Sequence, residues 1–390
     1  MTTNQKRNKK TCPERYRRVV VGMSGGVDSS VALLLLKKQG WEPIGVTLKL
    51  PVWENKKNLL RENVCCTTES MNVAKLICKK LDIPYFIIDC QKDFTKKIVN
   101  YFVSELKNNR TPNPCVVCNR DFKFQKLFEV AKKMGANYVA TGHYTRIRIR
   151  ELKIKNALPT GRQAECRKFE LLIAKDTKKD QSYMLSGLSQ KDLAKIILPL
   201  GDLTKKDVYK IAKRESCLPE GRGFKFFEKI RQSQDFCFVS GKSLPAFLKQ
   251  KIGEKPGNII NENGKIIGQH KGRHFFTLGQ RKGINISNGP YFVFGFDKKK
   301  NVVYATKDKN KLFKKEILLS PYHLISGEKL KKPINVLAKT RYHQELFPAK
   351  IIPQGKKLKL IFKKPVFSPT PGQFAVFYDK NVCLGNGVII

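Results

Sequence analysis

The sequence predicts an α/β protein in which a doubly wound, mostly parallel sheet is followed by a small β-rich domain and a C-terminal β-barrel. Three observations indicate this fold. Apolar strand-like runs alternate with amphipathic helix-like segments over the first 140 residues, and a glycine-rich turn joins the first strand to the first helix. Beyond residue 240 the chain breaks into short β runs separated by glycine and asparagine. With 390 residues the chain is too long for one core, so several domains are expected.

The glycine-rich turn at residues 22–29 reads Gly-Met-Ser-Gly-Gly-Val-Asp-Ser and lies between a valine-rich strand and a leucine-rich helix. Gly25 and Gly26 allow positive φ angles and a close approach of the backbone to a ligand. We expect Ser24, Ser29 and the first N–H groups of the helix to point outward as donors. Together with the helix dipole they predict a phosphate site, and an ordinary βα turn is the alternative. The turn matches neither the lysine-containing P-loop motif nor GxGxxG.

Strands and helices continue in alternation after this turn. Strands are expected at 44–48, 85–88 and 138–140, and helices at 69–81, 94–106 and 124–134. Because ligands of such sheets bind outside the carboxyl ends of the strands, residues 22–29 and 141–143 should converge. Leu48 would then lie beside an adenine. A capping or core role is one reading of His143, but its place directly after a strand end favours a substrate contact.

The composition is strongly basic, with 77 Lys plus Arg against 32 Asp plus Glu and a net charge of +45. This excess favours a polyanionic partner such as a nucleic acid, and a generally lysine-rich surface is the alternative. Residues 1–18 are read as a basic flexible tail and not as a secretory signal. The sequence contains no apolar run long enough to span a membrane. Eleven cysteines without a signal peptide indicate a reducing, cytoplasmic location.

A Thr-Pro-Asn-Pro-Cys-Val-Val-Cys-Asn motif places two prolines in a stiff turn before a helix. Cys115 and Cys118 lie at i and i+3 near the start of that helix. We expect the helix dipole and the cations Arg110, Arg120 and Lys123 to lower their pKa, which suits a nucleophile or a metal ligand. A single CxxC is only half of a zinc site, so a structural zinc is not expected.

The second half of the chain adds one more cysteine motif and many short strands. Residues 149–168 are charged and are read as an irregular surface insertion before a strand at 169–174. Cys237 lies between two phenylalanines and, taken alone, would be a core residue. Further β runs are expected at 257–260, 264–268, 275–278, 291–296, 302–304, 334–338, 357–362, 373–378 and 387–390. The predicted divisions are the tail 1–18, an ATP-binding catalytic domain 19–240, a central β-rich domain 241–310 and a C-terminal barrel 311–390.

Six motifs in order give the chain its resemblance to a known family. The glycine-rich loop resembles that of the ATP pyrophosphatases, the PP-loop superfamily. The full set resembles the tRNA-specific 2-thiouridylases, the MnmA/TrmU family, from about Val19 to the C-terminus. The motifs are Ser24–Ser29, Thr111–Asn119, Gly142–Tyr144, Lys179–Tyr183, Ser233–Phe238 and Phe276–Gly283.

The resemblance implies an enzyme that binds the anticodon loop of tRNA, with no DNA or membrane partner. ATP with Mg²⁺ would adenylate the C2 oxygen of the wobble uridine, and sulfur would replace that oxygen to give 2-thiouridine, AMP and pyrophosphate. Cys118 is implied as the nucleophile. Cys237 is implied as the carrier of a persulfide received from an upstream sulfur donor, with a redox disulfide between the two cysteines.

The resemblance also implies two sets of binding residues. The implied ATP contacts are Gly22, Met23, Ser24, Gly25, Gly26, Val27, Asp28, Ser29, Leu48 and Gly142. The implied contacts with tRNA and the target base are Asn113, Pro114, Cys115, His143, Lys179, Asp180, Gln181, Arg341, Tyr342 and Gln373. In the central domain, exposed basic groups around Arg273 and Arg281 would add contacts with RNA.

One departure from the family leaves two mechanisms open. Many members carry Asp where this chain has Cys115, so an acid–base role at that position is in doubt. Cys115, Cys118 and Cys237 are also the kind of cysteine set with which related tRNA thiolases hold a [4Fe-4S] cluster, so thiolation through a cluster is an alternative.

Two other classes of protein are alternatives to a thiouridylase. A non-catalytic RNA-binding protein would explain the charge but would leave the ATP loop and the paired thiols idle. An ATP-dependent amide ligase would explain the loop but not the cysteines.

Overall fold

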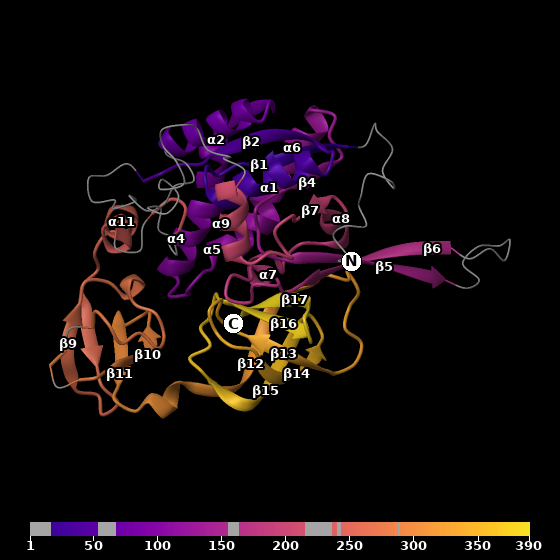
Figure 1. The fold of residues 1–390 in the computed structure, drawn as a ribbon. Coiled ribbons are helices and arrows are strands. Elements are labelled where there is room, and N and C mark those ends of the chain that lie inside the picture. The colour runs from indigo at the N-terminus through magenta and orange to yellow at the C-terminus, as the bar shows by residue number, and fades with distance from the viewer. Residues whose placement is uncertain are drawn as a thin grey trace.

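The structure is a computed structural model of the full chain, and it describes residues 17–53, 68–154, 164–214, 236–239, 243–284, 286–287 and 289–390. Most of the expected tail 1–18 lies outside the described residues. A five-stranded parallel sheet, a four-stranded sheet and a β-barrel follow one another along the chain (Figure 1). This arrangement confirms the predicted α/β class with two β-rich additions.

The parallel sheet has the strand order β3-β2-β1-β4-β7. Its strands are β1 (Arg18–Gly22), β2 (Glu42–Lys49), β3 (Tyr85–Asp89), β4 (Tyr138–Ala140) and β7 (Ile196–Ile197). The central strand β1 pairs with β2 on one side and β4 on the other. The strand order therefore reverses between β1 and β4, and a crevice is expected where the loops after these two strands leave the sheet.

Helices cover both faces of this sheet because successive residues of β1 point to opposite sides. Val19 and Val21 pack with α1 (Val27–Lys38), α2 (Thr68–Lys80) and α9 (Lys205–Arg214). Val20 packs on the other side with a group of helices that includes the cysteine motif. These helices are α3 (Gln91–Phe94), α4 (Asn100–Lys107), α5 (Pro114–Cys118) and α6 (Phe124–Lys133), joined by the π-helical turns η4 (Thr95–Val99) and η5 (Asn119–Lys123).

The prediction of an irregular insertion at 149–168 is wrong. β5 (Arg146–Ile154) and β6 (Ala164–Leu172) form an antiparallel hairpin with nine consecutive residue pairs in register. The high charge of both strands suggested a surface loop, although residues 146–150 alternate arginine with isoleucine and Ile147 is buried at the root of the hairpin. The hairpin projects from the body of the molecule, and its root pairs with the last strand of the barrel (Figure 1).

The central domain has the strand order β10-β11-β8-β9, and several short elements precede, interrupt or follow its strands along the chain. The strands are β8 (Gly257–Ile260), β9 (Ile266–His270), β10 (Phe292–Asp297) and β11 (Val302–Thr306), and the short elements are α7 (Ser182–Leu185), α8 (Gln190–Leu193), α11 (Leu244–Ile252), η7 (Arg273–Phe275) and η8 (Lys309–Leu312). The strand expected at 275–278 is wrong. Phe276 and Leu278 instead pack against the small core of this domain from a loop.

The C-terminal strands form a barrel in the order β12-β15-β14-β13-β16-β17, which closes because β12 also pairs with β17. The strands are β12 (Phe313–Leu324), β13 (Ile334–Lys339), β14 (Phe347–Gln354), β15 (Lys357–Phe367), β16 (Phe374–Asp379) and β17 (Val382–Ile389). Alternating residues such as Leu358, Leu360 and Phe362 fill its interior. Within the described ranges, the helices are all too short or too polar to cross a bilayer.

Candidate active site

The loop between β1 and α1 is held from behind by neighbouring elements. The Thr47 hydroxyl donates to the carbonyl of Met23 at 3.0 Å, which ties the loop to β2. Gly25 has a φ of +73° and lies against Ser70 of α2. A Cβ atom at Gly25 would lie 2.3 Å from the Ser70 carbonyl oxygen, so only glycine fits there. Two independent elements therefore fix the loop before any ligand arrives.

The serines of this loop support it from within. The Ser29 hydroxyl donates to the Gly26 carbonyl at 3.0 Å and lies 3.2 Å from the Ser24 hydroxyl. Ser29 is buried, so its hydroxyl does not point outward as expected. The cause is the start of α1, where a short hydroxyl side chain can bond to the backbone of its own turn.

The loops after β1 and β4 meet at Gly142. A Cβ atom there would lie 2.7 Å from the carbonyl carbon of Asp28 and 2.8 Å from the Ser29 nitrogen. The Tyr144 hydroxyl donates to Asp28 Oδ1 at 2.7 Å. Burial, with the nearby charge of Asp28, raises the pKa of Tyr144, so the hydroxyl keeps its proton. These contacts confirm that residues 22–29 and 141–143 converge.

Lys205 is the counter-ion of Asp28, a role that the sequence analysis missed. Its Nζ atom lies 2.6 Å and 2.8 Å from the two carboxylate oxygens, and its side chain is 11% exposed against 35% for Asp28. The ammonium also lies over the ring of Tyr144 at 5.7 Å and that of Tyr209 at 5.0 Å. It occupies the first position of α9, which the Thr204 cap predicts. No local signal links it to a residue 177 positions away.

Helix α5 presents the first two cysteines. Asn113 caps it by accepting hydrogen bonds from the N–H groups of Cys115 at 3.1 Å and Val116 at 3.3 Å, with Pro114 in the first turn. The expected stiff turn before a helix is thus confirmed. Cys118 is 7% exposed and is a thiol in this structure.

The prediction of lowered thiol pKa values is wrong for this conformation. Burial raises the pKa of Cys118 to about 11, and the nearby charge of Lys123 offsets only part of that increase. Burial likewise raises the pKa of Cys115. Arg110 is paired with Glu105 at 2.8 Å and Arg120 with Asp121 at 2.7 Å. The removal of the thiols from water therefore outweighs the cations on which the prediction depended.

Cys237 lies in a tight turn that packs against the same helices. The turn is closed by a bridge between Phe236 and Val239, and Trp53 N–H donates to the Phe238 carbonyl at 3.0 Å. Residues 233–235 of its motif lie outside the described residues.

Aromatic contacts connect this turn with the helix of Cys118. The ring of Phe238 lies 6.1 Å from that of Phe94, which lies 5.2 Å from that of Phe122. Phe122 is four residues after Cys118. Cys118 and Cys237 consequently belong to one hydrophobic cluster, although they are far apart in the sequence.

The donor set for a metal cluster is not assembled in this conformation. Over the part of the chain that the structure describes, no group of three or more His, Cys, Asp or Glu side chains is arranged to hold a metal ion. Cys115, Cys118 and Cys237 therefore do not fit a [4Fe-4S] cluster as they are placed here.

Two of the expected tRNA contacts connect the three domains near the cysteine helix. Gln373 of the barrel donates to the Thr111 carbonyl at 3.0 Å, in the turn that leads to Asn113. Arg341 of the barrel donates to the carbonyls of Leu278 in the central domain, at 3.3 Å, and of Ser368, at 3.0 Å. The three domains thus meet beside the start of α5.

Tyr342 lies where this junction approaches Cys115. Its ring is 5.9 Å from that of Tyr183, and the ammonium of Lys339 lies 5.6–5.7 Å from both rings. Burial, together with the charges of Asp180 and Cys115, raises the pKa of Tyr342 to about 12. The arrangement places two aromatic rings and one ammonium group near Cys115, with Tyr183 fully buried and Tyr342 and Lys339 half-buried.

Three other expected contacts are engaged inside the protein. The Asp180 carboxylate accepts hydrogen bonds from Ala174 N–H at 3.0 Å and from the Ser182 hydroxyl at 2.7 Å, and the Gln181 side-chain carbonyl accepts one from Tyr144 N–H at 2.9 Å. His143 Nδ1 lies 2.7 Å from the Thr141 hydroxyl, and burial lowers the pKa of His143 to about 3. These three side chains therefore bond to protein groups around the site. Lys179 is half-buried and lies in the turn that precedes Asp180.

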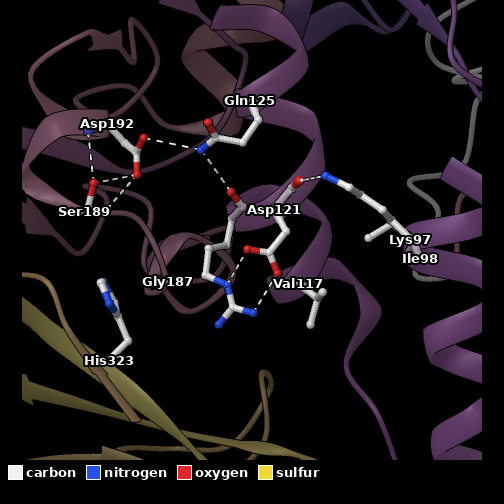
Figure 2. Close-up of a pocket in the computed structure, with 10 residues that line it drawn as sticks. Lys97, Ile98, Val117, Asp121, Gln125, Gly187, Ser189, Asp192 and His323 are labelled. Carbon is white, nitrogen blue, oxygen red and sulfur yellow. Dashed lines mark hydrogen bonds and ion pairs between the residues drawn. The ribbon is translucent and has the colours of Figure 1, made fainter. Parts of the chain in front are cut away.

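A cavity of about 650 Å³ lies beside the cysteine helix (Figure 2). Val117, Arg120 and Asp121 face it from α5 and η5, and His323 reaches it from the barrel. Its lining includes none of the expected site residues. The cavity borders the cluster that holds the two cysteines, because Ile98 and Val117 belong to both.

The fold and site define a PP-loop nucleotide-binding protein with two β-rich domains and with one buried and one half-buried cysteine in the same hydrophobic cluster. The chain belongs to the tRNA-specific 2-thiouridylase family. Three domain families match in order, described as tRNA methyl transferase HUP domain at residues 17–241, tRNA methyl transferase PRC-barrel domain at 245–307 and aminomethyltransferase beta-barrel domain at 314–389.

Relatives named tRNA-specific 2-thiouridylase MnmA match this chain over nearly its whole length. The protein of Roseiflexus sp. (strain RS-1) is 37% identical over 379 residues, which cover 95% of this chain and 99% of the relative. That of Halothermothrix orenii is 39% identical over 378 residues, covering 95% and 98%. A third, from Geobacillus kaustophilus, is 37% identical and covers 96% of each chain.

Proposed function

We propose that this chain replaces the C2 oxygen of the wobble uridine of tRNA with sulfur, using ATP. The observation that carries the proposal is the combination of a braced PP-loop at the switch point of the sheet with Cys118 and Cys237 in one cluster nearby. The names of the relatives agree with this reaction. Neither an RNA-binding module nor an amide ligase accounts for both features.

The first step is activation of the base. The C2 oxygen attacks the α-phosphorus of ATP, the N3 proton is lost, and pyrophosphate leaves toward residues 22–29. Mg²⁺ would supply positive charge to the phosphates, and Asp28 is the residue of this loop that fits it. Lys205 already holds a positive charge beside Asp28, so a second cation bound there would weaken the Asp28–Lys205 pair. The C2 oxygen is a poor leaving group by itself. After adenylation it can leave as part of AMP, which is a good leaving group.

The second step transfers sulfur. The outer sulfur of a Cys237 persulfide attacks C2, and AMP leaves. The Cys118 thiolate then attacks the inner sulfur of Cys237, which breaks the persulfide bond and forms a Cys118–Cys237 disulfide while the outer sulfur stays on C2. A cellular thiol reductant returns the disulfide to two thiols. Because burial raises the pKa of Cys118, this step requires a change around the thiol when tRNA binds.

The partners follow from this sequence of steps. The anticodon loop must present an unstacked uridine, for which Asn113, Pro114, Cys115, Arg341, Tyr342 and Gln373 form the surroundings. An upstream persulfide donor must reach Cys237. Such partners place the protein in the cytoplasm.

The test is thiolation of an unmodified tRNA transcript by protein purified without oxygen and assayed for iron. ATP, Mg²⁺ and a cysteine desulfurase with L-cysteine are added, and thionucleosides are read by mass spectrometry. We expect 2-thiouridine from iron-free protein, its loss in Cys237→Ser and Cys118→Ser, and its retention in Cys78→Ser, a buried control cysteine on α2. Absence of 2-thiouridine with the wild type would reject the proposal. Activity that follows iron content and is lost in Cys115→Ser would replace the persulfide route with a cluster.

A further inference from the structure

The β5–β6 hairpin has no role in the chemistry described above. Each strand has nine residues, so the ribbon extends about 30 Å at ~3.3 Å per residue. It stands clear of the three domains beyond its root (Figure 1). Beyond its root the hairpin contributes little to a hydrophobic core, so core packing does not explain its presence.

The two faces of the hairpin differ in charge. On one face, Arg150 stands directly opposite Lys168, a like-charge pair that destabilises a ribbon. On the other face, Glu151 stands directly opposite Arg167, an opposite-charge pair that stabilises it. The like-charge pair therefore lies on one face only, next to the opposite-charge pair Arg148–Glu170 of the same face.

The cations of that face are held in position. Arg148 Nε and Nη2 lie 2.7 Å and 2.6 Å from Glu170, and Arg150 Nη1 lies 3.1 Å from the same carboxylate, which is 10% exposed. Arg146 donates to the Ile173 carbonyl at 2.9 Å. The side chains of Arg148 and Arg150 remain 36% and 58% exposed. We name Arg146, Arg148, Arg150 and Lys168 the arginine face. Successive arginines stand about 7 Å apart, two residues along a strand.

The root of the arginine face joins the candidate active site. β5 begins two residues after Tyr144, whose hydroxyl contacts Asp28. Arg146 Nη1 lies 3.7 Å from Asp202, and the preceding residue, Gly201, accepts a hydrogen bond from Lys175 N–H at 2.9 Å. The root of the arginine face therefore lies beside the turn at Gly201, which is hydrogen-bonded to Lys175, four residues before the expected tRNA contact Lys179.

We propose that the arginine face binds the phosphate backbone of the tRNA substrate outside the anticodon stem–loop. The inference rests on the proposed function, since it assigns a second contact surface to the same substrate. A row of guanidinium groups fits phosphates without reading sequence, and such contacts orient a nucleic acid on its protein. The like-charge pair at the exposed part of the ribbon is then maintained for binding and not for folding.

The test compares two variants of the same ribbon. Arg150→Gln/Lys168→Gln removes the like-charge pair, and Arg167→Gln removes one exposed cation from the opposite face. Affinity for full-length tRNA transcript and for an isolated anticodon stem–loop is measured at several salt concentrations, with thermal unfolding and thiolation assayed in parallel.

For the double variant we expect roughly tenfold weaker binding of full-length tRNA and a salt slope lower by about 1 to 2, because each phosphate contact contributes about 0.7–0.9 to the slope. Its thermal stability should be unchanged or higher. Arg167→Gln should bind within twofold of the wild type, and the isolated stem–loop should bind all three proteins equally.

Four results would overturn the inference. The first three are an unchanged salt slope of tRNA binding in the double variant, an equal loss of tRNA affinity in Arg167→Gln, and an equal loss of affinity for the stem–loop. The fourth is a thiolation defect of the double variant at saturating tRNA with unchanged tRNA affinity. That result would indicate that the face binds the sulfur donor. A wild type that neither binds nor thiolates tRNA would instead reject the proposed function, so the two failures are distinguishable.

Discussion

The Nζ atom of Lys205 lies 2.6 Å from Oδ1 of Asp28, which joins the first residue of α9 to the carboxylate of the PP-loop. The Tyr144 hydroxyl contacts the same oxygen from the loop after β4. Three segments that are distant in the sequence therefore meet at one carboxylate, and each of them bears on how the loop receives a nucleotide.

Removal of the Lys205 ammonium should destabilise the protein. Lys205→Arg keeps the positive charge and should be close to the wild type in stability. For Lys205→Met we expect a loss of about 1–2 kcal/mol, below the ~3–5 kcal/mol of a fully buried pair, because Asp28 is still about one-third exposed. Urea denaturation of Lys205→Met, Asp28→Asn and the double variant measures the coupling between the two residues. Simple additivity of the two single effects would show that the contact contributes nothing.

A side chain at position 142 should displace the PP-loop. The Cβ of Gly142→Ala would overlap backbone atoms of Asp28 and Ser29, which cannot move independently of α1. We expect at least a tenfold loss in ATP affinity by calorimetry, equivalent to about 1.4 kcal/mol. Gly295→Ala in the central domain, where the Cβ would have ordinary contacts of 3.4 Å or more, is the matched control. Equal affinities for the two variants would contradict the packing argument.

Cys118 should react slowly with alkylating agents in the absence of tRNA. With a pKa of about 11 against an ordinary 9.0, its thiolate fraction at pH 8 is roughly 100-fold lower than that of an unperturbed thiol. The rate should rise about tenfold per pH unit until the pH approaches this pKa. Peptide mass spectrometry after iodoacetamide treatment at several pH values gives the rate. A plateau near pH 7 would mean that the thiol is activated already in the unbound protein.

His143 should make the protein less stable as the pH falls below 6.5. Burial, and secondarily Lys123, lower the pKa of His143 to about 3, whereas an ordinary histidine titrates at 6.5. Between these values the unfolded chain binds a proton that the folded chain does not, so the free energy of unfolding decreases with decreasing pH, by at most about 1.4 kcal/mol per unit. His143→Gln should have a shallower slope between pH 6.5 and 4. Identical slopes would show that His143 is protonated in the folded state.

Loss of the cap at Asn113 should loosen the cysteine helix. Asn113→Ala removes the acceptor for two N–H groups and should lower stability by about 1 kcal/mol. Asn113→Asp keeps an acceptor and should retain that stability by thermal unfolding. If the Asp variant is stable but does not thiolate tRNA, the side-chain amide itself contacts the base.

Local patterns in the sequence determined most of the elements of this fold. The alternation of valine-rich strands with amphipathic helices, the Gly25–Gly26 turn and the Asn113–Pro114 helix start are short-range signals, and the structure contains each of them. The order of six motifs indicated the family that the comparisons confirm. The hairpin at 146–172 was missed because its high charge suggested a surface loop, although residues 146–150 alternate arginine with isoleucine at the period of two that marks a strand.

Only the tertiary structure decided the environment of the site residues. Lys205 reaches Asp28 because α9 packs beside α1, and Cys118 shares a cluster with Cys237 because aromatic rings from three segments pack together. The raised pKa of Cys118 has the same origin, since nearby cations in the sequence predicted a decrease while burial by distant residues produced an increase. Ion pairing and desolvation depend on atoms that are close in space, and a local pattern carries no record of them.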